Sequence, residues 1–187
     1  MTTKWLAGIL VVGLLICAAS PSMAQDKGQT AAAELATSSQ AALQQLAASV
    51  PLAKALIPSA HAILVFPKVT KAGLGVGGQY GEGALLKKGT AVAYYKTTGA
   101  SFGLQAGGQQ YGYAMFFLNE KSLAQLDSAK GFEVGVGPSV VMVDEGMAKT
   151  TTTTTLKDDI YAFVFGQKGL MAGLGLQGNK IAKITPK

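Results

Sequence analysis

The hydrophobic pattern of the chain changes once along its length, from helical to extended spacing. Over Gln29–Val50, apolar residues recur every three or four positions among alanines and glutamines, and this spacing predicts a helix. Pro51 fits the first turn of a shorter helix that follows, and Pro58 ends it. Farther along, short apolar runs separated by glycine-containing turns predict strands. We therefore expect a single α+β domain, helical over 29–57, with a mainly antiparallel sheet over 61–187 that is barrel-like or two-layered.

Glycines share one face of the first long strand pattern, Lys71–Leu86 (KAGLGVGGQYGEGALL). Side chains alternate between the faces of a strand, so Gly73, Gly75, Gly77, Gly81 and Gly83 all fall on one face, which is nearly bare backbone. Glycine weakens a strand interior, and a face without side chains is suited to close approach by another backbone or by large rings. Related orders recur in Ser101–Phe117, Phe132–Pro138 and Gly169–Gly178. We expect these four segments to form the main strands of the β-rich part.

Turn and capping residues divide the β-rich part further. Pro67 is expected to end a first short strand, Ala62–Phe66, and turns are expected at Lys88-Gly89 and Thr98-Gly99. Asn119 is a suitable N-cap for one short internal helix, Glu120–Ala129. The remaining expected elements are strands at Val134–Val143, Met147–Leu156, Ile160–Phe165, Gly169–Leu176 and Lys180–Ile184, with a turn at Asp144-Glu145-Gly146.

The N-terminal segment has the pattern of a signal peptide. Lys4 provides the basic start, Leu6–Ala18 the apolar region, and Ser22-Met23-Ala24 the small residues of a cleavage site. The apolar region is shorter than the roughly 20 residues that a membrane span needs. We expect residues 1–24 to be removed and 25–187 to form the mature domain, exported to the periplasm.

Cys17 permits an alternative in which a lipid is attached to a cysteine at the processed N-terminus. That signal requires a small residue directly before the cysteine, and Ile16 occupies this position. Cleavage after Ala24 would also remove the only cysteine, so the mature domain would be held together by its hydrophobic core and not by disulfides.

The basic charge of the chain comes entirely from lysine. The sequence has 16 Lys and Arg residues, all of them lysine, against 10 acidic residues. Lysine lacks the planar, bidentate fork of arginine that reads bases and fixes phosphates, which argues against a nucleic-acid partner. A modest attraction to anionic lipid or polymer remains open beside the simpler role of keeping the surface soluble.

No group of residues predicts catalysis or cofactor binding. The two G-x-G-x-x-G matches, which begin at Gly73 and Gly173, neither open a helix nor precede a suitably spaced acid, as a dinucleotide site requires. His61 is the only histidine, and the adjacent acids Asp144-Glu145 and Asp158-Asp159 do not converge, because neighbouring strand residues face opposite ways. We expect a non-enzymatic protein without a metal or other cofactor.

Four longer blocks closely resemble a known family, the SYLF domain. They are ILVFPKVTKAGLGVGGQYGEGALL, AYYKTTGASFGLQAGGQQYGYAMFF, GFEVGVGPSVVMVDEG and IYAFVFGQKGLMAGLGLQGNKI, and the resemblance spans Leu52–Ile184. It implies a single domain of antiparallel β-structure with flanking helices, no catalytic activity, and binding to phospholipids. Eukaryotic members bind phosphoinositides with help from a basic amphipathic N-terminal helix, and yeast members also bind actin. The corresponding helix here carries almost no charge beyond Glu34 and Lys54.

The leading hypothesis is a phospholipid-binding module of the cell envelope that associates peripherally with anionic membranes. The alternatives are a small integral outer-membrane β-barrel and a structural envelope protein that binds other, unidentified proteins. The candidate lipid-binding residues are Lys68, Lys71, Lys87, Lys88, Lys180 and Lys183. A straight strand would place the first two pairs in separate patches, and Lys87 and Lys88 are preferred because a hairpin turn would project them into solvent.

Overall fold

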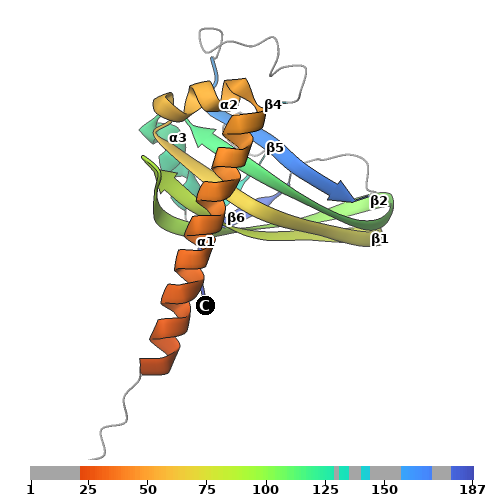
Figure 1. Cartoon of the computed structure of the whole chain (residues 1–187). Helices are drawn as coiled ribbons and strands as arrows, with labels where there is room; N and C mark the ends of the chain where they lie inside the picture. The colour runs from red at the N-terminus through yellow and green to blue at the C-terminus, as the bar shows by residue number, and fades with distance from the viewer. Residues whose placement is uncertain (1–21, 129–130, 135–139, 144–156, 170–177) are drawn as a thin grey trace, which may run out of the picture.

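The computed structural model describes residues 22–128, 131–134, 140–143, 157–169 and 178–187. Most of the expected signal peptide, the turn at 144–146, the strand at 147–156 and nearly all of the strand at 169–176 lie outside these residues. Within them, the protein is α+β, as predicted, with a curled and mostly antiparallel sheet and helices on its two sides (Figure 1).

The two predicted N-terminal helices are present. Helix α1 spans Ser22–Ser49, and α2 spans Pro51–Leu56 with its proline in the first turn, followed by a short 3-10 helix, η1, at Ile57–Ser59. Leu46 is fully buried on the inner face of α1. Among the described helices, none combines the length and the apolar character needed to cross a bilayer.

Strands β1 (Ala62–Lys87) and β2 (Thr90–Phe117) form one long antiparallel hairpin. Lys88 and Gly89, with φ angles of 49° and 81°, make its two-residue turn, so the turn predicted there is confirmed. The two other predicted breaks were wrong. Pro67 lies in a bulge where the pairing register shifts, a position that tolerates the missing N–H group. At Thr98-Gly99 the ladder continues without a turn, and Gly99 pairs with Gln79.

Strand β2 is the centre of the sheet, whose order is β3 (Phe132–Glu133), β6 (Lys180–Ile184), β2, β5 (Ile160–Gly169) and β4 (Val140–Val143), with β1 on the other edge of β2. Strands β6 and β5 pair with successive parts of β2. Of the strand predicted over Val134–Val143, the structure confirms Val140–Val143, whereas Val134 follows a separate short strand and residues 135–139 lie outside the described residues. Strand β3 pairs with β6, and β4 runs parallel to β5.

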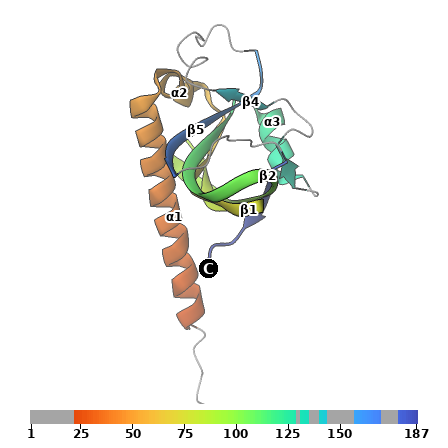
Figure 2. The ribbon, with the colours of Figure 1, turned by 90° about the vertical axis from the view of Figure 1, so that its right-hand side faces the viewer.

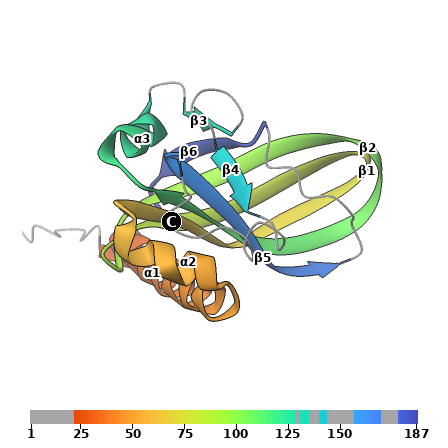
Figure 3. The ribbon, with the colours of Figure 1, turned by 90° about the horizontal axis from the view of Figure 1, so that it is seen from above.

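The β1–β2 hairpin curls so far that the two ends of β1 pack against each other (Figures 2 and 3). A Cβ atom at Gly81 would lie 2.8 Å from the Lys68 carbonyl oxygen, and one at Gly83 would lie 2.8 Å from Phe66 Cδ1. Both glycines are buried. The close approach that the glycine face predicts is therefore found at these two positions.

The curl gives the sheet an enclosed face and an outer face, each with its own hydrophobic cluster. Phe66 belongs to the enclosed face, where its ring stacks on Tyr113 at 4.7 Å between centroids, and this face is closed by α3 (Glu120–Ala124) and the 3-10 helix η2 (Gln125–Asp127). The outer face packs against α1 and α2. Figure 2 shows α1 and α3 on opposite sides of the curled sheet. The N-cap predicted for the internal helix is confirmed, because Asn119 Oδ1 accepts from the Ser122 N–H at 2.8 Å.

Candidate functional site: a lysine-rimmed pocket at the chain ends

The structure does not gather the six lysines proposed from the sequence. Lys87 and Lys88 are exposed at the β1–β2 turn, and Lys68 is exposed at the bulge in β1. Lys71 is buried, with 5% of its surface exposed. On β6, Lys180 is exposed and pairs in register with Thr98 and Glu133, while Lys183 lines a pocket.

The curl of β1 shortens the separation expected between the first two lysine pairs. The Lys68 carbonyl oxygen lies against Gly81, which is only six strand residues before Lys87. Six residues of strand span about 20 Å, so these lysines remain in different patches.

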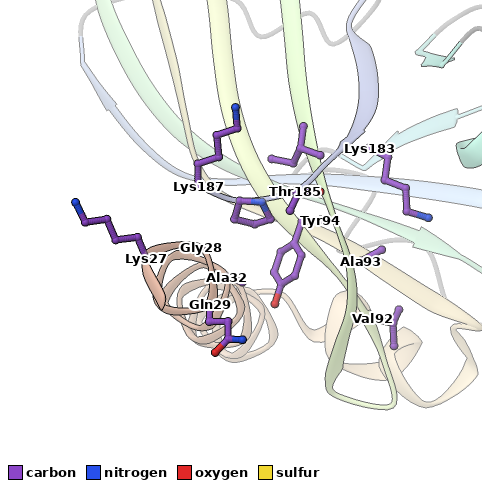
Figure 4. A pocket seen from close by; sticks show the side chains of 12 residues that line it. Lys27, Gly28, Gln29, Ala32, Val92, Ala93, Tyr94, Lys183, Thr185 and Lys187 are labelled. Carbon is purple, nitrogen blue, oxygen red and sulfur yellow. The ribbon is translucent and has the colours of Figure 1, made fainter. Parts of the chain in front are cut away.

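Lys183 belongs to a pocket of about 830 Å³ between α1, the start of β2 and the C-terminal residues, which we call the C-terminal pocket. Its lining is largely apolar and includes Ala32, Val92, Ala93, Tyr94, Ile184 and Pro186. Figure 4 shows the Tyr94 ring between α1 and β2. Val92 is an aliphatic residue that remains 53% exposed, so the pocket presents apolar surface to solvent.

Two contacts between distant parts of the chain build this pocket. Strand β6 pairs with β2 so that Ile184 lies opposite Tyr94 and Lys183 opposite Tyr95. The N-terminal turns of α1 then meet the residues after β6, where a Cβ atom on Gly28 would lie 3.3 Å from the Pro186 carbonyl oxygen. The pocket therefore requires α1, β2 and the C-terminal residues together.

Three lysines, Lys27, Lys183 and Lys187, surround the apolar lining. All three are exposed, and Figure 4 shows Lys27 and Lys187 extending away from Tyr94 while Lys183 lies on the opposite side. In the part of the chain that the structure describes, no ion pair holds Lys27 or Lys187. An apolar cavity with free ammonium groups at its rim can accept a molecule with a hydrocarbon part and a negatively charged group.

Lys183 differs from the other two lysines because it has an acidic partner. Its Nζ lies 3.4 Å from Asp127 Oδ2 and 5.9 Å from the centre of the Tyr95 ring. The Tyr95 hydroxyl donates to Asp127 Oδ1 at 2.6 Å. Burial, with this hydrogen bond as the second cause, raises the pKa of Tyr95, so the phenol remains protonated and continues to donate to the carboxylate.

Lys87 and Lys88 line a second cavity, of about 720 Å³, which we call the hairpin pocket. Leu43, Ile57, His61, Ile63 and Leu118 are among its other lining residues. The Gln40 side chain donates to the Gly89 carbonyl at 2.7 Å and fixes the hairpin turn to α1. The preferred lysine pair of the sequence therefore also lies beside apolar surface.

Sequence reasoning found Lys183 but missed Lys27 and Lys187. Nothing in the local sequence marks either residue, because the pocket exists only where the two ends of the described chain meet. Among the described residues, no group of three or more His, Cys, Asp or Glu side chains could hold a metal ion.

A comparison of the chain with protein-family models tests the resemblance to the SYLF domain. Residues 98–185 match a family model described as Ysc84, the Las17-binding protein actin regulator. The matched region runs from the middle of β2 through β6 and contains Lys183 and Ile184, but not Lys27 or Lys187. No curated protein matches the chain. Residues 98–185 of this chain therefore match the SYLF domain family, in agreement with the resemblance found in the sequence.

Proposed function

We propose that this protein is a non-enzymatic phospholipid-binding module that associates peripherally with anionic membranes through the C-terminal pocket. The observation that carries the proposal is the combination, in one cavity, of an apolar lining with three exposed lysines, Lys27, Lys183 and Lys187. A phospholipid has the matching chemistry, because its acyl chain can bury apolar surface while its phosphate contacts ammonium groups.

The expected affinity is modest and sensitive to salt. A lysine near an anionic surface contributes about 1 kcal/mol, and this contribution is screened within a Debye length of about 8–10 Å at ordinary ionic strength. Apolar contacts with Val92 and Tyr94 would contribute the part of the binding that salt does not remove. Peripheral association predicts release of the protein from membranes by a high-salt wash.

The proposal includes export of the protein to the periplasm after removal of residues 1–24. Its support is the signal-peptide pattern at Lys4, Leu6–Ala18 and Ser22-Met23-Ala24. The intact mass of the envelope-localised protein tests this part, because cleavage after Ala24 leaves Gln25 as the first residue. A mass that retains Cys17 with an attached diacylglyceryl group would instead make the protein a lipoprotein.

Charge reversal at the two pockets tests where lipid binds. Lys27→Glu combined with Lys187→Glu should weaken co-sedimentation with vesicles that mix phosphatidylglycerol and phosphatidylcholine, whereas the melting temperature should not change. The matched control, Lys87→Glu with Lys88→Glu, makes the same charge change at the hairpin pocket and should have the smaller effect. The proposed site is wrong if the control pair is the more damaging one, or if binding survives both reversals and high salt.

A second candidate function is the binding of another protein. The matching family model is described by a protein partner, Las17. Near the bend of the β1–β2 hairpin, Leu74 is 83% exposed and Val76 is 63% exposed, which is unusual for neighbouring aliphatic side chains. If Leu74→Ser and Val76→Ser leave vesicle binding intact but abolish capture of a protein by the purified chain, this surface would serve a protein partner.

A further inference from the structure

Lys183 is shared between two cavities of the protein. Besides the C-terminal pocket, it lines a smaller pocket of about 420 Å³ with Leu126, Asp127, Ser128, Gly131 and Ala182. The two pockets thus share one lysine residue, whose ammonium group lies 3.4 Å from Asp127 Oδ2. Lys183 therefore lines the C-terminal pocket, while Asp127, which lines the smaller pocket, partly neutralises its charge.

Asp127 is itself held in place. Its Oδ1 accepts the Tyr95 hydroxyl at 2.6 Å, and Tyr95 is only 1% exposed. The carboxylate remains accessible, because the Asp127 side chain is 52% exposed and that of Lys183 is 59% exposed. A fixed carboxylate beside a long, exposed lysine competes with any other anion for that lysine.

We infer that Asp127 is a specificity-determining residue that lowers the affinity of the C-terminal pocket for anionic headgroups by holding Lys183. This inference rests on the proposed lipid site. Of the three lysines that line the C-terminal pocket, only Lys27 and Lys187 offer uncompensated charge, and a phosphate must displace Asp127 before it gains Lys183. The pair therefore limits binding to membranes that carry enough negative charge to compete.

The test compares Asp127→Asn with Glu120→Gln in binding to vesicles of phosphatidylglycerol and phosphatidylcholine. Both changes remove one negative charge from the α3–η2 segment, but Glu120 lines neither pocket. Asparagine keeps an oxygen that can accept from the Tyr95 hydroxyl. We expect Asp127→Asn to bind about fivefold more tightly, the equivalent of one freed lysine, and Glu120→Gln to change binding far less.

A double-mutant cycle shows whether Asp127 acts through Lys183. In a Lys183→Gln background, Asp127→Asn should no longer tighten binding. Equal effects of Asp127→Asn and Glu120→Gln, or a gain that persists without Lys183, would overturn the inference. If Asp127→Asn melts below the wild type, the single variants decide: Lys183→Gln should weaken binding less than Lys187→Gln, and equal losses would contradict a restrained Lys183.

Different experimental results would contradict the proposed function and this inference. If Lys27→Glu with Lys187→Glu leaves vesicle binding unchanged, the C-terminal pocket is not the lipid site and both ideas fail. If that pair weakens binding while Asp127→Asn behaves like Glu120→Gln, the pocket binds lipid but Asp127 does not tune it.

Discussion

At the scale of single residues, the absence of a side chain at Gly83 lets the sheet curl. A Cβ atom there would lie 2.8 Å from Phe66 Cδ1 and closer still to the Val65 carbonyl oxygen. Carbonyl oxygens of a paired strand cannot move aside as a flexible side chain can. The glycine therefore fixes how closely the two ends of β1 approach.

Gly83→Val should destabilise the protein by about 1–3 kcal/mol or more, because overpacking at a buried contact forces the backbone to shift. Chemical denaturation measures the change in the free energy of unfolding. Gly78→Val is the matched control, since the nearest atom to a Cβ at Gly78 is the Gly99 carbonyl oxygen at 3.8 Å. Equal stability of the Gly83 and Gly78 variants would show that the close approach at β1 is not required.

At the scale of elements, α1 stabilises the contact between the two ends of β1. The hydroxyl of Ser39, which is fully buried, donates to the Val65 carbonyl at 3.3 Å and accepts from the Ala84 N–H at 3.2 Å. One side chain of the helix thus bonds both ends of the same strand. Without it, two buried backbone groups would lose a partner.

We predict that Ser39→Ala lowers the free energy of unfolding by about 1–3 kcal/mol, the usual result of leaving buried polar groups unsatisfied. Ser38→Ala provides the control, because the Ser38 hydroxyl is exposed and bonds only to Glu34 O within the same helix. Urea denaturation of both variants gives the comparison. Similar stabilities would mean that α1 holds the sheet by apolar packing alone.

The sequence pattern predicted the helices, the Lys88-Gly89 turn and the glycine face, because each depends on residues close together in the chain. It did not predict that β1 and β2 continue through Pro67 and Thr98-Gly99. A proline normally ends a strand, and only the bulge at Pro67, set by pairing with β2, allows the strand to continue. Pairing partners far away in sequence likewise decided that β3 and β4 join different edges.

At the scale of the whole molecule, the candidate site forms only where parts of the chain that are distant in sequence come together. Lys27 and Lys187 stand near opposite ends of the chain and meet at one pocket only because α1 and the residues after β6 flank the start of β2. Lys183 could be proposed from its charge alone, whereas its partner Asp127 belongs to η2, 56 residues earlier in the chain. The spacing of residues along the sequence does not predict such long-range contacts.

The buried tyrosines of the enclosed face also make the whole fold less stable at alkaline pH. Burial raises the pKa of Tyr111 to about 12 and also raises the pKa values of Tyr95 and Tyr113, compared with about 10 for an unfolded tyrosine. The folded protein therefore keeps protons that the unfolded chain loses above pH 10. The stability contributed by these phenols is complete below that pH and declines as the pH rises toward 12.

For each tyrosine that stays protonated, the cost to the folded state should be about 0.7 kcal/mol per pH unit at pH 10, where half of the unfolded tyrosines are deprotonated, and should approach about 1.4 kcal/mol per pH unit near pH 11. Three such tyrosines should therefore approach a combined cost of about 4 kcal/mol per pH unit. Urea unfolding at pH values from 9 to about 11 measures the slope. Tyr111→Phe should reduce the slope by about one third, whereas Tyr80→Phe should reduce it less, because Tyr80 is 50% exposed. Phenolate absorbance should rise together with loss of the folded state. A flat stability profile above pH 10, or phenolate formation by all tyrosines in the folded protein, would mean that the enclosed face admits hydroxide without unfolding.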